Sequence, residues 1–176
     1  SDRFPGNNTS LVTLVTFGRY QEAIDTFAPL YPELSCGAGP QVDRNNLSQA
    51  INLSLAWEES GERECSDLLL DGVLDQLRTM PRLGGRGYGI ADVEVYARQG
   101  KTRLALDTLR EAIDGGFRWF WWAQGPGSPH MVSLFENPEF KDMVREIETD
   151  MSAQLERLRE MEANGELAAA PPLSMD

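Results

Sequence analysis

Hydrophobic residues over positions 9–114 recur at helical spacing around three glycines, Gly18, Gly61 and Gly100. A large apolar residue precedes each glycine by four positions, and small or apolar residues follow it by five, nine and twelve. These three following positions share one face of a helix, because an α-helix turns once in about 3.6 residues. The residues are Leu14, Trp57 and Tyr96 before the glycines, then Ala23, Ser66 and Ala105, then Phe27, Leu70 and Leu109, and finally Leu30, Val73 and Ala112.

Each glycine predicts a tight turn where one helix stops and the next begins. Small residues five positions later let the two helices of a hairpin approach closely, and the large residues fill the space between them. A single hairpin cannot bury its apolar face alone, so successive hairpins must stack. The pattern therefore predicts an all-α fold in which three helical hairpins form an α-α superhelix.

The chain beyond these hairpins follows a different pattern. A run of aromatic residues and a Gly/Pro loop precede two helix starts, Ser128-Pro129 and Asn137-Pro138, each a capping residue followed by proline. A long helix is predicted from about Pro138 to Ala163, closed by Asn164-Gly165. The predicted organisation is an N-terminal segment 1–8, the hairpins 9–114, an aromatic linker with capping helices 115–165, and a flexible tail 166–176.

The apolar residues of the long helix fall three or four positions apart. We expect its first half to pack on the third hairpin and to cap the array, as terminal units must. Its second half, from Met151 to Met161, is long enough to extend past the body, which would leave Leu155, Leu158 and Met161 as a candidate dimer interface. The alternative is that this half folds back over the first helices.

Four consecutive aromatic residues, Trp119 to Trp122, form the most unusual stretch of the sequence. They cannot all face one way, so some must wedge into the core between the last hairpin and the long helix. The interpretation is a mostly buried cluster in which Trp119 or Trp122 remains exposed as a partner-binding anchor.

The hairpin pattern resembles the tetratricopeptide repeat, which has a glycine, a small residue five positions on and large or small residues nine and twelve positions on. The closest stretches are Gly18–Ile24, and Tyr96–Gly100 followed by Ala105, Leu109 and Ala112. The family repeats about every 34 residues, whereas 43 residues separate Gly18 from Gly61 and 39 separate Gly61 from Gly100. The extra residues fall in 29–40 and 81–89. The resemblance implies helix pairs that bind a protein or peptide.

Residues 112–140 resemble the C-terminal region of tetratricopeptide-containing bacterial signalling proteins, in which an aromatic segment and a long closing helix follow the last repeat. The residues that match are Ala112, Gly116, Phe117, Arg118, Trp121, Trp122, Leu134, Asn137, Pro138 and Phe140. The resemblance implies that a DNA-binding or catalytic domain, where the protein has one, lies upstream of Ser1. Because the chain does not begin with Met, we also expect further sequence upstream.

The two cysteines, Cys36 and Cys65, are too few for a disulfide scaffold or a zinc site. Two buried thiols are the favoured interpretation, and a disulfide in an oxidising compartment is the alternative. Membrane-anchored relatives place this region outside the cytoplasm, so a periplasmic or other extracytoplasmic location is favoured over a cytoplasmic one.

The composition of the chain restricts the classes of partner that it is expected to bind. The chain has 41% hydrophobic and 25% charged residues, and its net charge is -12, with 28 acidic residues against 16 basic ones. This balance argues against binding to nucleic acid or to an anionic membrane surface. No run approaches the ~18 apolar residues that a membrane span needs. The acidic surface favours solubility over a basic partner.

No residue pattern predicts catalysis, a cofactor or a metal. His130, the only histidine, stands beside no nucleophile motif and is expected to be a partly exposed residue at a helix start. The glycine-rich segment 84–89 follows a predicted helix rather than the strand that a phosphate loop needs. Acidic residues over 58–67 fit solvated helix ends better than a carboxylate dyad.

The sequence thus favours a non-catalytic interaction scaffold that binds a protein or peptide through a helical-repeat surface. The alternative is a regulatory or sensory C-terminal domain of a multidomain bacterial signalling protein or membrane-anchored transcriptional regulator. Partner-binding candidates are polar residues on the first helix of each hairpin and the two outer tryptophans. They are Asn45, Asn52, Glu94, Trp119 and Trp122.

Overall fold

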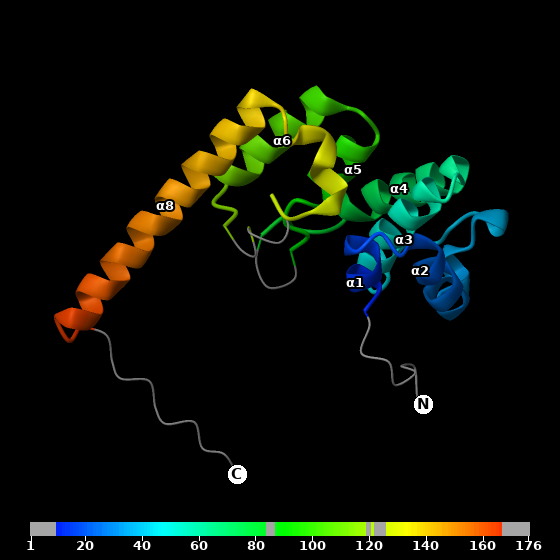
Figure 1. Cartoon of the computed structure of the whole chain (residues 1–176), viewed down its shortest axis with the longest axis horizontal. Helices are drawn as coiled ribbons and strands as arrows, with labels where there is room; N and C mark the ends of the chain where they lie inside the picture. Colours follow the sequence, from blue (N-terminus) through cyan, green and yellow to red (C-terminus); the bar gives the residue numbers. More distant parts are fainter. Residues whose placement is uncertain (1–9, 84–86, 119–120, 122–125, 167–176) are drawn as a thin grey trace, which may run out of the picture.

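The computed structural model describes residues 10–83, 87–118, 121 and 126–166, which form helices, 3-10 turns and loops without a strand (Figure 1). The predicted all-α class is confirmed, and a regular superhelix stays a prediction. The hairpins are α1 (Leu11–Thr16) with α2 (Tyr20–Phe27), α3 (Leu47–Glu59) with α4 (Arg63–Leu77), and α5 (Ala91–Arg98) with α6 (Thr102–Asp114). The 3-10 turns η1 (Ala28–Leu30), η2 (Pro32–Leu34) and η3 (Cys36–Ala38) follow α2, and η4 (Pro129–Leu134) precedes α8 (Pro138–Ala163).

The predicted turns at the three glycines are confirmed, and all three have one geometry. Gly18, Gly61 and Gly100 have φ of +68°, +91° and +71°, the left-handed region that glycine enters without steric cost. In each turn the N–H after the glycine donates to the carbonyl oxygen five residues earlier, at N···O distances of 2.8, 2.9 and 2.9 Å. This is the Schellman helix cap, and it satisfies carbonyls that the helix end leaves unpaired.

The small residues five positions after the glycines are fully buried. Ala23 and Ala105 are 0% exposed and Ser66 is 1% exposed, so the helices of each hairpin pack closely at these points. The prediction that the residue twelve positions after the glycine packs on the buried helix face is wrong in the first hairpin, where Leu30 is 45% exposed. The reason is that α2 ends at Phe27 and a 3-10 turn follows, which rotates Leu30 off the face that helical spacing predicted.

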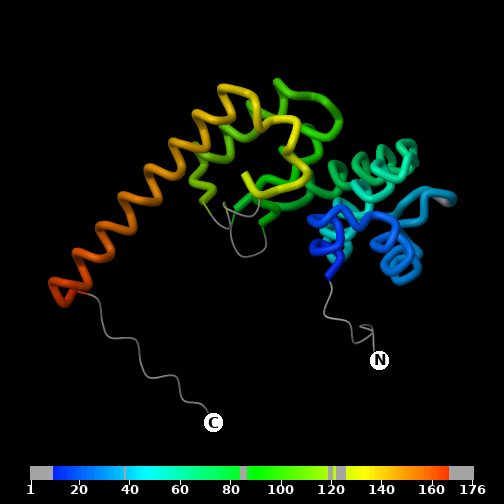
Figure 2. Tube along the Cα trace, viewed as in Figure 1, coloured from blue at the N-terminus to red at the C-terminus, as the bar shows by residue number. Residues whose placement is uncertain are grey.

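Two hydrophobic cores meet at α5. The first two hairpins share one core, and the third hairpin, η4 and the first half of α8 share the other. In Figure 2 the first group of elements runs from blue to cyan and the second from green to orange. Helix α5 contributes to both, because Ala91 and Val95 pack into the first core while Val93 and Ala97 pack into the second. The third hairpin is therefore held on both of its sides.

Helix α8 matches the predicted range and extends past the hairpins (Figure 1). Asn137 caps it, since its side-chain oxygen accepts from the N–H of Glu139 at 2.9 Å. Phe140, Met143 and Ile147 are buried in the second core, whereas every residue from 151 to 160 is exposed. The alternative in which this half folds back over the first helices is wrong.

Candidate functional site

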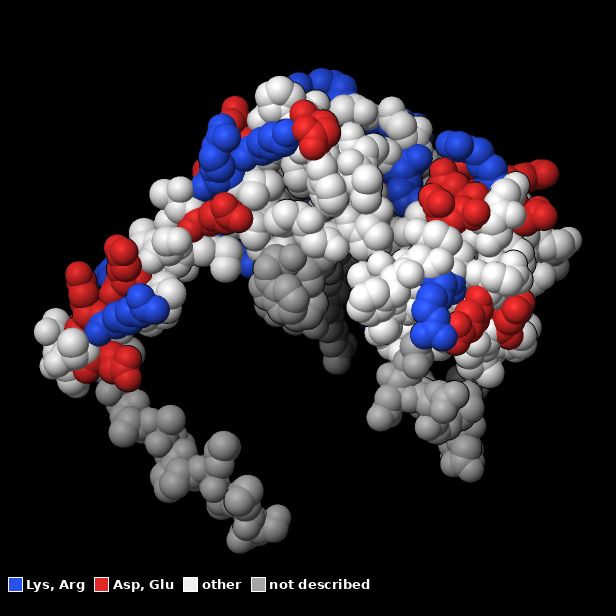
Figure 3. All heavy atoms as spheres, in the orientation of Figure 1, with Lys and Arg blue, Asp and Glu red and all other residues white. Residues whose placement is uncertain are grey.

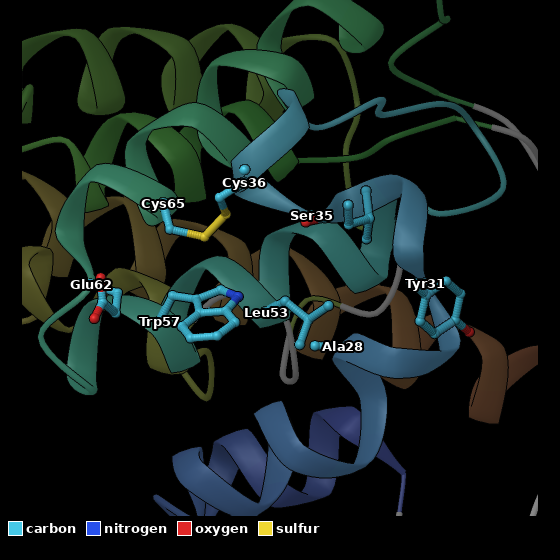
Figure 4. Close-up of a pocket in the computed structure, with 10 residues that line it drawn as sticks. Ala28, Tyr31, Ser35, Cys36, Leu53, Trp57, Glu62 and Cys65 are labelled. Atoms are coloured by element: carbon cyan, nitrogen blue, oxygen red, sulfur yellow. A yellow bond between two sulfur atoms is a disulfide. The ribbon is translucent and has the colours of Figure 1, made fainter.

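A cavity of about 410 Å³ lies where the 3-10 turns after α2 meet the second hairpin (Figure 4). Helix α3 contributes Leu53 and Trp57, which lie four residues apart and so share one face of the helix. Tyr31 and Leu34 come from the 3-10 segment. Apolar side chains therefore make up most of the wall, and we call this cavity the Trp57 pocket.

A disulfide between Cys36 and Cys65 closes one side of the Trp57 pocket. The two Cα atoms are 5.3 Å apart, a usual separation for a disulfide. Figure 4 shows the bond directly beside the Trp57 indole. The interpretation of two free thiols is thus corrected: the fold brings η3 against α4, a proximity between residues 29 positions apart that spacing alone does not reveal.

The chain between α2 and α3 is shaped to form this wall. Pro29 and Pro32 each lie in the first turn of a 3-10 helix, where proline's fixed φ is compatible and its missing N–H is not needed. The Gln41 N–H donates to the Glu33 carbonyl oxygen at 2.7 Å, which closes residues 33–41 into a loop. The residues between α2 and α3, which make the spacing from Gly18 to Gly61 longer than 34 residues, therefore build one wall of the pocket.

The rim of the Trp57 pocket is polar and acidic. Ser35 and Glu62 line its mouth and are both exposed. Glu59, at the end of α3, and Glu64, in the first turn of α4, lie on either side of Glu62 in the sequence and are also exposed. Within the part of the chain that the structure describes, no group of three or more His, Cys, Asp or Glu residues is placed to hold a metal ion.

Two of the predicted partner-binding residues are buried, so their expected position in an accessible groove is corrected. Glu94 is 8% exposed and accepts a hydrogen bond from the Ser128 hydroxyl at 2.7 Å. Asn52 is 7% exposed and its amide donates to the Ser48 carbonyl oxygen at 2.8 Å. Asn45 is exposed, and its backbone N–H donates to the Asp43 carboxylate at 2.7 Å in the turn before α3.

The aromatic segment is described only in part. Trp119 and Trp122 lie outside the described residues. Trp121 is 2% exposed and packs edge-on against Phe117, with ring centroids 6.5 Å apart. These two rings belong to the second core, which agrees with an aromatic wedge between the third hairpin and α8.

His130 is buried rather than partly exposed, which corrects the expectation for the only histidine. It is 6% exposed in η4, and burial, assisted by the charge of Arg98, lowers its pKa to about 3. Glu94, on the neighbouring α5, has its pKa raised by burial to about 7, against the opposing effects of the Ser128 hydrogen bond and of Arg98. Glu94 and His130 lie on α5 and η4, which pack against each other, and neither residue lines the Trp57 pocket.

We expect the Glu94→Gln substitution to stabilise the protein at high pH only. The pKa of Glu94 rises from 4.5 to about 7 on folding, so its contribution is fully present below pH 4.5 and is lost as pH rises through 7. His130 acts in the opposite sense, because its lowered pKa costs stability as pH falls below 6.5. The amide keeps the acceptor for Ser128 but cannot ionise.

Urea unfolding of both proteins at several pH values measures this difference. The stabilising effect of Glu94→Gln should be near zero at pH 4 and reach about 1–3 kcal/mol at pH 8. Substitution of the exposed Glu62 by glutamine is the control and should show no such trend. An effect of Glu94→Gln that is equal at all pH values would contradict the buried carboxylate.

Comparisons with protein-family models, with curated proteins and with solved structures found no match to this chain. No described helix is both long enough and apolar enough to cross a bilayer.

The sequence did not predict the Trp57 pocket. It assigned to Trp57 only the role of filling space between the helices of its hairpin. The signals that pointed to the pocket were the proline-rich insertion and the two cysteines.

Proposed function

We propose that this chain is a non-catalytic binding module that holds a protein or peptide segment by one large apolar side chain in the Trp57 pocket. The observation that carries the proposal is the apolar cavity of about 410 Å³ beside a partly exposed tryptophan. Pockets of roughly 300–1,000 Å³ hold small ligands, so this one suits a single large side chain. Buried aromatic anchors are the usual energetic centres of protein interfaces.

The charge around the Trp57 pocket indicates which residues the bound protein or peptide segment should carry beside its apolar side chain. Glu62 lines the pocket, Glu59 and Glu64 lie within three residues of it, and the exposed Arg63 is the one basic residue among positions 58–64. The chain beside the pocket is therefore net acidic, as is the whole chain with its net charge of -12. Glu58 contributes less, because Arg98 already pairs with it. A segment with Lys or Arg beside its apolar residue is therefore the complementary partner.

Filling the pocket is expected to weaken the binding of such segments. Random linear peptides displayed on phage would be selected on the wild-type protein. We expect the enriched peptides to share a large apolar residue next to a basic one. Ser35→Phe, which places a ring at the pocket mouth, should weaken their binding at least about tenfold, or about 1.4 kcal/mol.

Two variants control this measurement. Ser35→Ala leaves the pocket open and should bind as the wild type does. Glu62→Lys reverses one rim charge and should weaken mainly the peptides that carry the basic residue. If no peptide family is enriched, or if the enriched peptides bind Ser35→Phe as well as the wild type, the proposed function is wrong.

We further propose that the three hairpins are degenerate tetratricopeptide units. The shared turn geometry at the three glycines and the buried small residue five positions later support this assignment. The Cys36–Cys65 disulfide supports an oxidising, extracytoplasmic compartment as the setting, since cytosolic thiols are usually kept reduced.

A further inference from the structure

The Cys36–Cys65 disulfide lies in the wall of the Trp57 pocket, where a small molecule that enters the pocket can reach it. Both cysteines line the cavity, and the bond lies beside the Trp57 indole (Figure 4). Cys65 is 8% exposed, whereas Cys36 is half-buried and stands between the exposed Ser35 and Gly37. The Cys36 end of the bond is therefore the more accessible to a reagent.

The disulfide is what ties η3 to α4. Among the described residues, no hydrogen bond or ion pair joins Ser35, Cys36 or Gly37 to that helix. The Gly39 N–H donates to the Cys36 carbonyl oxygen at 3.3 Å, which holds only the turn itself. Leu34, just before this segment, is 3% exposed in the first core. Breaking the disulfide therefore releases η3 and leaves Leu34 packed where it is.

We propose that this disulfide is a thiol-sensitive switch of the Trp57 pocket. Reduction by an external dithiol releases η3 from α4, opens one wall of the pocket and lowers its affinity for the bound segment. The inference deepens the proposed function and rests on it for the nature of that segment.

The chemistry is thiol–disulfide exchange. A thiolate of the dithiol attacks the Cys36 sulfur, and the Cys65 sulfur leaves as a thiolate that takes up a proton. The second thiol of the reagent then attacks the reagent's own sulfur in the mixed disulfide and returns Cys36 as a thiol. Two electrons and two protons pass to the protein, and the dithiol becomes a cyclic disulfide.

Occupation of the pocket and reduction of the bond oppose each other. A large apolar side chain in the cavity covers the wall that carries the disulfide, so the thiol no longer reaches Cys36. If reduction weakens binding by a given factor, binding must make reduction less favourable by the same factor, because the two equilibria are linked. The occupied pocket thus preserves the disulfide, and the empty pocket is the state that responds to a thiol.

The acidic residues near the pocket favour some thiols over others. Glu62 lines the cavity, and Figure 3 shows acidic side chains over the end of the molecule that the first two hairpins form. A reagent that carries a negative charge besides its thiolate is repelled. The effective reductant is therefore a dithiol that is otherwise neutral or cationic.

Reduction by dithiothreitol, followed by alkylation and mass spectrometry, tests access to the bond without any peptide. The rate should stay the same in urea below the unfolding transition, because the folded protein itself reacts. Ser35→Phe, whose ring covers the pocket mouth, should slow the reaction at least about tenfold, and Ser35→Ala should react as the wild type does. A rate that rises steeply with urea, or that Ser35→Phe leaves unchanged, would overturn the proposal.

Hydrogen exchange measures the release of the wall. The backbone N–H groups of residues 36–41 should exchange at least about tenfold faster after reduction. Those of α6, which packs in the second core, are the control and should be unchanged. Equal exchange of residues 36–41 in the oxidised and reduced proteins would show that the disulfide does not hold the wall, and the switch would be excluded.

A charge reversal tests the preference among thiols. Glu62→Lys should speed the reaction with the anionic 2-mercaptoethanesulfonate more than the reaction with dithiothreitol, because only the former carries a second negative charge. An equal change for the two reagents would refute the preference.

Peptide affinity tests the link to binding. Peptides selected on the oxidised wild type should bind the reduced protein at least about tenfold more weakly, and reoxidation should restore the affinity. Cys36→Ser/Cys65→Ser should bind as the reduced protein does and should not respond to dithiothreitol. Unchanged affinity on reduction would refute the switch alone, whereas the absence of any selected peptide would refute the proposed function and the switch with it.

Discussion

Replacing Arg98 with alanine is expected to lower the free energy of unfolding by about 3–5 kcal/mol, because it removes one partner of a buried ion pair. The Arg98 side chain is only 4% exposed, and its guanidinium pairs with the Glu58 carboxylate. It also donates to the Ser66 hydroxyl at 2.8 Å and to the Ser54 hydroxyl at 2.5 Å. One side chain of α5 thus binds both helices of the second hairpin.

The large effect has a specific physical cause. Ser66 is 1% exposed and its hydroxyl loses the donor that Arg98 supplies, whereas the buried Ser54 hydroxyl keeps its bond to the Ile51 carbonyl oxygen at 2.7 Å. Each buried polar group left without a partner costs about 1–3 kcal/mol. The loss should also loosen the junction between the two cores, which meet at α5.

Urea unfolding measures this effect against a matched control. Arg110 pairs with Glu146 at 2.8 Å, but the two side chains are 38% and 48% exposed. Solvent screens such a pair, so Arg110→Ala should cost less than about 1 kcal/mol. Equal losses for the two alanine variants would mean that Arg98 does not join the hairpins as described.

Removal of the disulfide by Cys36→Ser/Cys65→Ser is expected to cost about 3–4 kcal/mol. The bond closes a loop between residues 29 positions apart, and a loop of this length restricts the unfolded chain considerably. The substitution also releases η3 from α4 and so loosens one wall of the Trp57 pocket. We therefore expect weaker peptide binding together with the lower stability.

Thiol titration and unfolding with and without reductant measure this effect. The unreduced protein should show no free thiol, and reduction should expose two and lower the stability of the wild type to that of the double serine variant. Reductant should leave that variant unchanged, which is the control. Two free thiols in unreduced protein would contradict the disulfide.

The local elements of the fold were open to prediction because their causes lie within a few residues. A glycine four positions after a large apolar residue specifies the cap at Gly18, Gly61 and Gly100, and the capping side chain of Asn137 followed by proline specifies the start of α8. Leu30 shows the limit of such spacing. The prediction assumed one continuous helix, and the prolines after Phe27 ended it.

The sequence by itself determined the all-α class, the three glycine turns and the long closing helix, because hydrogen bonds between near neighbours fix each of them. Only the tertiary structure decided that Cys36 meets Cys65, that Glu94 and Asn52 are buried, and that Leu155 and Leu158 are left uncovered. These outcomes depend on how separate helices pack. The periodicity of one helix shows which face is apolar, and the packing of the whole chain decides what, if anything, covers that face.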